Sequence, residues 1–368
     1  ERGDITYGVN SEKPFTGTSV EYYIDTIIKD EFEERVLWKR ITYKDGMLDG
    51  LFESFHPNSQ LEVRENYKLG VEHGLYEMFY ENGQLQETGN FIDGYKDSLW
   101  EFFYEDGRLT ETINYKEGLK HGLHEDFVED FINIRENYNN GELDGLYEKF
   151  YKFSSQLESR TNFTDGKLDG LHEMFYEDGQ LTETINYKMG LKHGLRENFH
   201  ENGELISRTN YKNGELDGLW EEFHSDGELT RRSNYKNDKL NGLREWFDEN
   251  GTLTETKEYK DGKKHGLSEV FYENGRLKSM ENYKDGQKDG PVEWFFVNGQ
   301  LQTKSNHEKG KLHGLWENYH KNGQLEIRGT HKNGKKEGLW KYYDEYGFQI
   351  IESCYKEGEE TDMSYCEN

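Results

Sequence analysis

Proline, cysteine and long apolar runs are scarce in this sequence. Its 368 residues include only three prolines beside 40 glycines, so the glycines do not form a proline- and glycine-rich linker, and we expect them at turns. No stretch approaches eighteen consecutive apolar residues, which excludes a membrane-spanning helix. Hydrophobic residues make up 32% of the chain and charged residues 33%, a balance that by itself would indicate disorder.

Positive charge is also in deficit. Lys and Arg number 46 against 74 Asp and Glu, which gives a formal net charge of −28 at pH 7. Such a chain repels phosphate backbones and anionic headgroups, so neither nucleic acid nor an anionic membrane is an expected partner. Aromatic residues, in contrast, make up 15% of the chain. Because disordered segments are poor in these large side chains, the composition predicts a folded protein.

Catalytic signatures are missing as well. The sequence contains no GxGxxG, P-loop, HExxH, GxSxG or CxxC pattern. It therefore predicts no enzyme, no cofactor and no metal site.

A short step of Asp or His, Gly and Leu recurs along the chain. The spacing is 24 residues, apart from one of 23 and one of 25 that cancel around Gly145. The step positions are Gly50, Gly74, Ser98, Gly122, Gly145, Gly170, Gly194, Gly218, Gly242, Gly266, Gly290, Gly314 and Gly338. A divergent copy begins at Gly17, so there are about fourteen units. A fixed period of this length indicates a solenoid or array.

Each unit has the pattern of a β-hairpin. Counting from the step Gly as zero, Leu stands at +1, Glu at +3, an aromatic at +5, Leu at +11, Asn at +16 and Tyr at +17. Spacing of two places +1, +3 and +5 on one face of a strand, and +11 shares the parity of +17 on the next. Turns such as ENG and EDG, and a second Gly at +20, supply residues that tolerate positive φ.

The pattern predicts an all-β, elongated, solenoid-like array of about fourteen 24-residue β-hairpin repeats. Stacked units would bury the repeated rings against their neighbours. We expect the tandem repeats over residues 50–358. An N-terminal capping segment with the divergent first repeat would cover residues 1–49, and a C-terminal tail or cap residues 359–368.

The repeat resembles a known family. The unit (D/H)-G-L-x-E-x-F-Y-E-N-G-Q-L-x-x-x-x-N-Y-K-x-G is similar to the variant MORN repeat of bacterial proteins of the YwqK type, over roughly residues 14–358. Many of those proteins are labelled antitoxin components, and the opening EKPFTGTSVEYY resembles exported members of the group. The resemblance implies a β-hairpin array that serves as an interaction scaffold, with no established catalytic residues.

A ladder of glutamates at +3 is the most unusual feature. On strict alternation it shares the face of Leu +1 and Phe +5, so partial burial and hydrogen bonding are expected. The preferred interpretation is that each Glu accepts hydrogen bonds from turn amides or from a Tyr hydroxyl of an adjacent unit. The alternative is a row of sites for calcium or a cationic ligand, although one Glu per unit does not supply the six oxygens that calcium needs.

Histidines also recur, at the position before the step Gly. Asp, Asn or Glu fills the same position in other units, which favours a turn side chain that hydrogen-bonds backbone over a metal ligand. Equivalent positions would lie about 10 Å apart, too far to share one ion. The histidines are His73, His121, His193, His265 and His313.

Positions +2 and +4 carry the variation between units. Six of the seven Trp fall there, and Trp, Tyr and Arg dominate binding hot spots. A second packing layer is the alternative interpretation. The candidate partner-binding residues are Tyr76, Trp100, Tyr147, His172, Arg196, Trp220, Arg244, Trp246, Trp294, Trp316 and Trp340.

The sequence therefore predicts a non-enzymatic scaffold for protein–protein interaction, secreted or displayed on a bacterial surface, with a possible adhesive role. Cys354 and Cys366 lie twelve residues apart and could form a disulfide in an oxidising compartment. The chain begins at Glu1 rather than Met, which makes a removed leader one expectation. The alternative is a cytoplasmic antitoxin or immunity protein that neutralises a basic toxin by direct binding. A carbohydrate enzyme that uses ladder carboxylates is a third, weaker hypothesis, because a repeated ladder offers no unique cleft.

Overall fold

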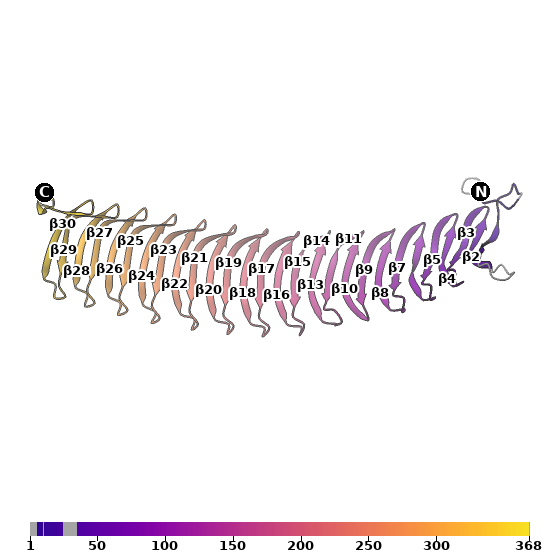
Figure 1. Ribbon diagram of the computed structural model, residues 1–368, viewed down its shortest axis with the longest axis horizontal. Coiled ribbons are helices and arrows are strands. Elements are labelled where there is room, and N and C mark those ends of the chain that lie inside the picture. The colour runs from indigo at the N-terminus through magenta and orange to yellow at the C-terminus, as the bar shows by residue number, and fades with distance from the viewer. Residues whose placement is uncertain (1–5, 10, 25–34, 368) are drawn as a thin grey trace. The chain divides into compact units, whose positions relative to one another are not determined.

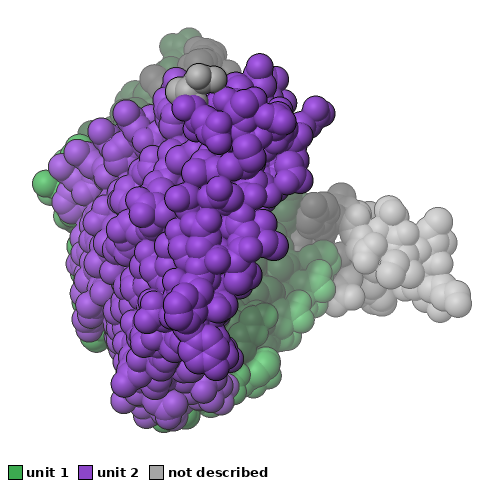
Figure 2. All heavy atoms as spheres, turned by 90° about the vertical axis from the view of Figure 1, so that its left-hand side faces the viewer, with its two compact units in different colours: residues 1–181, 187–190 green, residues 182–186, 191–368 purple. Residues whose placement is uncertain are grey.

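A computed structural model describes residues 6–9, 11–24 and 35–367. The chain forms two compact units, residues 1–181 with 187–190 and residues 182–186 with 191–368 (Figure 2). Residues 25–34 of the expected N-terminal capping segment lie outside the described residues. In the described part of that segment, Gly17 pairs with Tyr43 as Gly50 pairs with Tyr67. The divergent first repeat therefore has the hairpin register of the later ones.

Both units consist of antiparallel strands, which short turns join from β2 onward (Figure 1). Unit 1 contains β1 (Gly17–Ile24), β2 (Arg35–Lys44), β3 (Met47–Phe55), β4 (Leu61–Lys68), β5 (Val71–Phe79), β6 (Leu85–Ile92), β7 (Tyr95–Phe103), β8 (Leu109–Lys116), β9 (Leu119–Val128), β10 (Phe131–Asn139), β11 (Glu142–Leu143), β12 (Gly145–Phe150), β13 (Leu157–Thr164), β14 (Lys167–Leu168) and β15 (Gly170–Phe175). Residues of β16 (Leu181–Lys188) belong to both units.

Unit 2 repeats the same arrangement. It contains β17 (Leu191–Phe199), β18 (Leu205–Lys212), β19 (Glu215–Phe223), β20 (Leu229–Lys236), β21 (Lys239–Phe247), β22 (Leu253–Lys260), β23 (Lys263–Phe271), β24 (Leu277–Lys284), β25 (Gln287–Phe295), β26 (Leu301–Glu308), β27 (Lys311–Tyr319), β28 (Leu325–Lys332), β29 (Lys335–Tyr343), β30 (Gln349–Lys356), β31 (Glu359–Thr361) and the 3-10 helix η1 (Met363–Tyr365). The prediction of an all-β array of hairpin repeats is confirmed.

Two kinds of turn alternate along the chain. Between β5 and β6 the Tyr80 N–H donates to the Gln84 carbonyl, and Gly83 has φ of 81°, as expected for a three-residue loop that ends in a left-handed glycine. Between β4 and β5 the two central residues, Leu69 and Gly70, have φ of 51° and 83°. Positive φ at both positions is the geometry of a type I′ hairpin turn. Both turn predictions are confirmed.

A β-bulge changes which residues share a face. In the hairpin of β17 and β18, Asn198 pairs with Ser207 but Phe199 pairs with Leu205, so Ile206 at +12 is the extra residue. The bulge shifts the alternation by one residue. Leu at +11 therefore lies on the face of Phe +5, and Tyr at +17 lies on the opposite face, against the +2 side chain. The prediction that +11 and +17 share a face was wrong for this reason.

The two faces differ in burial. On what we call the ring face, side chains at +2 alternate across the strands with side chains at +15, and the +17 aromatics pack beside them. The opposite face, called the ladder face, carries +1, +3, +5, +11, +14 and +16. Among the residues whose burial the structure describes, the buried apolar side chains other than Cys354 belong to the +2 and +15 rows or their equivalents: Ile41, Trp100, Ile113, Ile185, Val292 and Trp340. The deepest packing is thus on the face that the sequence identified as variable.

Two glycines show how closely the ring face is packed. Gly89 and Gly329 stand at +15, next to Trp100 and Trp340 of the following unit. A Cβ added at either glycine would lie 2.2 Å from the indole ring, well inside van der Waals contact. Neither glycine is required by positive φ. Each is required because a tryptophan covers its Cα.

We predict that Gly89→Ala lowers the stability of the full chain by about 1–3 kcal/mol, because the new methyl group must displace the Trp100 ring. Urea unfolding followed by tryptophan fluorescence measures the effect. Gly70→Ala is the control, since nothing lies within 4 Å of a Cβ there and only the left-handed backbone is strained, at about 1 kcal/mol. Gly89→Ala should cost less in a Trp100→Val chain than in the parent, because the smaller side chain leaves room for the new methyl group. Equal midpoints for Gly89→Ala and the parent would contradict the packing.

Candidate functional site

The +3 glutamates form ion-pair ladders across the ladder face. In the hairpins that have a basic residue at +14, this residue lies on the strand that faces these carboxylates. In unit 2, the Arg208 Nε lies 2.9 Å from a Glu197 carboxylate oxygen, and the Arg208 Nη1 lies 3.8 Å from a Glu221 carboxylate oxygen. Arg232 continues the series, 3.1 Å from Glu221 and 3.6 Å from Glu245. The ladder therefore alternates acid and base from strand to strand.

Unit 1 repeats this arrangement. Arg40 lies 2.8 Å from Glu53, and Arg64 lies 3.3 Å from Glu53 and 3.2 Å from Glu77. Glu53 is buried although its arginines are partly exposed. Partial burial of the ladder was expected and is confirmed. The expected partners were wrong in most units, because arginine or lysine on the facing strand, and not turn amides, supplies the hydrogen bonds. Glu317 does accept a Tyr hydroxyl, from Tyr319 of its own strand.

Successive three-residue turns are linked by side chains that sequence analysis missed. The Asn82 side chain accepts from the Gln84 N–H at 2.9 Å and donates to the Glu105 carbonyl of the next turn at 2.8 Å. The Tyr80 hydroxyl donates to the Phe103 carbonyl at 2.8 Å. The aromatic or His at +6 and the Asn at +8 were visible as recurring residues. Their bonds to the next unit required the stacked geometry.

The residue before the step Gly also contacts backbone of the next unit. The Asp285 N–H donates to His265 Nδ1 at 3.4 Å, and the Lys309 N–H donates to an Asp289 carboxylate oxygen at 3.2 Å. His265 and Asp289 occupy equivalent positions in consecutive repeats. The interpretation of this position as a turn side chain that bonds backbone is confirmed at these sites. Among the residues that the structure describes, no cluster of three or more His, Cys, Asp or Glu could hold a metal ion.

Two of the candidate partner-binding tryptophans are buried. Trp100 is 0% exposed and Trp340 is 2% exposed. Trp100 packs 5.4 Å from the Tyr76 ring and 5.1 Å from the Phe91 ring, and its Nε1 donates to the Asn90 carbonyl. Side chains covered to this extent present no surface to a partner. The packing-layer interpretation therefore describes both tryptophans, and their assignment to a binding face was wrong.

The other candidate residues occupy the ring face without being fully buried. Trp316 packs 5.5 Å from Trp340, and Tyr147 packs 5.9 Å from Phe163. His172 contacts Tyr187 edge-on at 6.2 Å. Arg244 and Lys257 both lie 4.6 Å from the centre of the Trp246 ring. The Trp294 side chain is exposed, at 38%.

A hollow opens on the ring face of unit 2 around Trp220. Its volume is about 600 Å³, and Arg196, Tyr211 and Tyr235 are among its lining residues. The Trp220 ring meets Tyr235 edge-on at 5.9 Å, and Arg231 lies 4.3 Å from its centre. Glu183 holds the Arg196 guanidinium through two hydrogen bonds of 2.9 and 3.2 Å. Trp220 and Arg196 are thus the candidate residues that the structure brings together at one concave site.

Burial on the ring face alters the pKa of several groups. Burial raises the pKa of Glu65, and the hydrogen bond that the Tyr67 hydroxyl donates to it offsets part of that change. Burial beside the Trp100 ring lowers the pKa of Lys96, against the opposing effect of Glu87 and Glu111. Both groups are therefore engaged by their neighbours.

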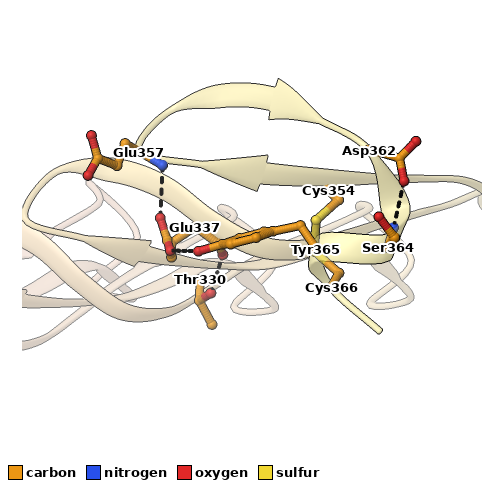
Figure 3. The surroundings of a disulfide bond; sticks show 8 residues. All are labelled: Thr330, Glu337, Cys354, Glu357, Asp362, Ser364, Tyr365 and Cys366. Carbon is orange, nitrogen blue, oxygen red and sulfur yellow. Dashed lines mark hydrogen bonds between the residues drawn. A yellow bond between two sulfur atoms is a disulfide. The ribbon is translucent and has the colours of Figure 1, made fainter. Parts of the chain in front are cut away.

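Cys354 and Cys366 form a disulfide at the end of unit 2, with Cα atoms 6.0 Å apart (Figure 3). The tail is also held by polar contacts. The Tyr365 hydroxyl donates to Glu337 at 2.8 Å, and Asp362 accepts from the Ser364 N–H at 3.0 Å at the start of η1. The structure therefore fastens residues 359–366 against the last hairpin. Within the described residues, none of the helices has the length and apolar character needed to cross a membrane.

We predict that Glu221→Gln destabilises unit 2 by about 1–3 kcal/mol, because the change leaves Arg208 and Arg232 facing each other without the carboxylate between them. The loss should shrink in 1 M salt, which screens the two arginines. Urea unfolding at low and high salt measures both effects. Glu249→Gln, on an exposed turn, is the matched control. A Glu221→Gln midpoint equal to that of Glu249→Gln would contradict a stabilising ladder.

We also predict that the last repeats lose stability as the pH falls below about 6.5. His307 and His331 occupy +17, where most units have Tyr. Burial, followed by the nearby Lys288 or Lys336, lowers the pKa of each. An unfolded chain then binds a proton at a higher pH than the folded one, so the stabilisation is complete above the unfolded pKa and is lost below it.

The matched variant is His331→Tyr, which restores the residue found at Tyr211 and Tyr235. Urea unfolding gives the free energy of unfolding at pH 7.5 and at pH 5.5. Between these two pH values it should fall more for the parent than for the variant, by under about 1 kcal/mol for this partly exposed ring. An equal fall in both proteins would show that His331 does not contribute.

The comparisons with known proteins agree with the repeat geometry. The model of the MORN repeat variant family matches residues 48–69, 72–93, 96–117, 168–189, 192–213, 216–237, 240–261, 264–285 and 312–333. These segments make up more than half of the chain. A search of curated proteins finds no match.

Solved structures give only weak likenesses. A crystal structure of TcdB2-TccC3 is 12% identical with a TM-score of 0.17, over 89% of this chain and 19% of that one. A Tc holotoxin pore from Photorhabdus luminescens is 13% identical with a TM-score of 0.17, over 90% of this chain and 18% of that one. This chain thus spans less than a fifth of either protein, and scores this low support no conclusion about it. The nine matched repeats, in contrast, show that the chain belongs to the MORN repeat variant family.

Proposed function

We propose that this chain is a non-enzymatic scaffold that binds other proteins, and that it is secreted or displayed on the surface of a bacterium. The observation that carries the proposal is the hollow around Trp220. It combines a partly accessible indole with Tyr211, Tyr235 and Arg196. Trp, Tyr and Arg in a concave, partly desolvated site are the side chains that contribute most to protein binding.

The surroundings of Trp220 favour a preformed binding site. Arg196 is already oriented by two hydrogen bonds from its guanidinium to Glu183, and Tyr235 fixes one edge of the indole. A partner would therefore order few side chains on binding, which lowers the entropic cost of association.

The state of the carboxylates supports a non-enzymatic role. Glu197, Glu221 and Glu245 are engaged by arginines on their facing strands. A general acid or base needs a carboxyl whose environment sets it apart from its neighbours. Here consecutive repeats place the same group in the same surroundings. This uniformity suits a scaffold better than a catalyst.

The disulfide supports a location outside the cytoplasm. Disulfides persist in oxidising compartments and are rare where thiols are kept reduced. The bond between Cys354 and Cys366 also holds the tail of the last unit.

The net charge of −28 favours a second candidate function. An acidic chain attracts basic proteins and speeds their association. An antitoxin or immunity protein that binds a basic toxin in the cytoplasm would use this property.

Affinity capture distinguishes the two candidates. The immobilised chain is exposed separately to host-cell surface proteins and to the cytoplasm of the source organism, in parallel with Trp220→Ala and Leu243→Ala. Leu243 is an exposed apolar residue of the ladder face and serves as the matched control. We expect Trp220→Ala to lose a surface protein that the parent and Leu243→Ala retain, under conditions in which circular dichroism shows that all three chains are folded.

The remaining outcomes are also informative. A single basic cytoplasmic protein lost in the same selective way would support the antitoxin function instead. Capture of the same proteins by all three chains, or of none, would contradict binding at the hollow.

A further inference from the structure

The last full strand of unit 2 is paired along one side and only at its C-terminal end along the other. β30 pairs with β29 from Gln349 to Tyr355, but on its other side β31 pairs only with Cys354, Tyr355 and Lys356. The equivalent strand β28 pairs with β27 on one side and with β29 on the other. Among the described residues, the outer edge of β30 over residues 349–353 therefore has no strand partner. This edge lies at the C-terminal end of unit 2 (Figure 1).

Apolar side chains gather on this open stretch. Phe348 is 70% exposed, Ile350 is 61% exposed and Ile351 is 57% exposed. Ile327 occupies the position of Ile351 one repeat earlier, and there it is only partly exposed because Tyr342 of the following strand pairs with it. The open edge thus lacks the strand that covers the same position elsewhere. Exposed apolar edges of this kind are sites at which another strand adds to a sheet.

The C-terminal tail does not supply the missing strand. Cys354 stands at +16, where Asn stands in most units and bonds the following hairpin, as Asn210 bonds the Leu219 carbonyl. Here the disulfide to Cys366 and the Tyr365 bond to Glu337 hold the tail at the type I′ turn end of β30 (Figure 3). The cap therefore protects one end of the edge and leaves residues 349–353 uncovered.

The charge pattern is reversed at this last hairpin. In several earlier repeats a glutamate at +3 faces an arginine or lysine at +14, as Glu317 faces Arg328. In the last repeat Lys341 stands at +3 and faces Glu352 at +14. A strand that adds to β30 in the register of the array would place its own +3 residue opposite Glu352. Another repeat of the usual kind would bring a second carboxylate there, which is unfavourable.

The reversed charge also disfavours a second copy of this chain. The strand of matching type at the other end of the array is β1, which carries Val20 at +3, paired with Arg40 on its covered side. It offers no cation for Glu352. Two chains that each carry a net charge of −28 would also repel each other. A basic residue from a different protein meets both constraints.

We propose that the outer edge of β30, residues 349–353, binds an extended segment of another protein as an added antiparallel strand. The segment carries Arg or Lys opposite Glu352 and an apolar side chain opposite Ile351. Backbone hydrogen bonds to the open edge supply affinity, and the ion pair at Glu352 sets the register and selects the sequence. This site is separate from the hollow around Trp220 and does not depend on a role for it.

Two synthetic peptides test the proposal against the full chain with its disulfide intact. One has the sequence of residues 263–271, KKHGLSEVF, which places the residue that corresponds to Val270 opposite Ile351, and the other has the same sequence with Arg in place of the residue that corresponds to Glu269. Fluorescence anisotropy of the labelled peptides gives the two affinities. We expect the Arg peptide to bind at least about tenfold more tightly, the effect of one charge-assisted pair.

Variants of the chain make the test reciprocal. Glu352→Arg gives the last repeat the charge of the earlier ones and should bind the unmodified peptide more tightly than the Arg peptide. Ile351→Lys should weaken both peptides while the melting temperature stays unchanged, because residue 351 is exposed. Trp220→Ala should leave both affinities unaltered, so that failure of this proposal and failure of the proposed function are distinguishable.

Three results would overturn the inference. The first is equal affinity for the two peptides, the second is no binding of either, and the third is an unchanged preference in Glu352→Arg. Sedimentation of the parent provides a further check. A dimer that Ile351→Lys dissociates would show that a second copy of the chain, and not a basic strand, occupies the edge.

Discussion

The packing of a large side chain at +2 against a small one at +15 is the contact on which the rest of the structure depends. A two-stranded hairpin has too little apolar surface to be stable alone, and the rows at +2 and +15 join each hairpin to the next. Where the ring is largest, as at Trp100 and Trp340, the facing residue is reduced to glycine. Where the facing residue is longer, as at Lys257 or Glu281, the +2 residue is Ser268 or Val292. Volume is thus matched at these four pairs.

Around this contact, three sets of polar interactions fix the spacing of the repeats. Ion-pair ladders cross the opposite face, Asn side chains connect the three-residue turns, and the residue before the step Gly bonds the next type I′ turn. Each set joins a repeat mainly to its neighbour. Stability should therefore be close to a sum of nearest-neighbour terms. Departures from the pattern then indicate candidate binding sites, as at the hollow around Trp220 and at the reversed charges of Lys341 and Glu352.

Local features of this fold could be predicted from the sequence, and features that depend on register could not. Turn glycines and two-residue periodicity act over a few residues, so the hairpins and both turn types followed from them. No particular residue type marks the bulge at Ile206 and its equivalents. The bulge places Leu +11 and Tyr +17 on opposite faces of the sheet. The ladder partners were detectable in part, since Arg64, Arg208, Arg232 and Arg328 all stand at +14. Thr256 and Met280 replace them elsewhere and hide the pattern. The hollow at Trp220 depends on the packing of three repeats and has no sequence signal of its own.

Native-state hydrogen exchange of the full chain tests most directly whether ring-face packing holds the repeats together. The account predicts the slowest exchange in the strands around the two buried tryptophans, β6 and β7 in unit 1 and β28 and β29 in unit 2. It predicts fast exchange at residues 349–353, whose outer edge is open. Uniform protection along the chain, or the greatest protection in repeats that have the longest ion-pair ladders and no buried tryptophan, would contradict it.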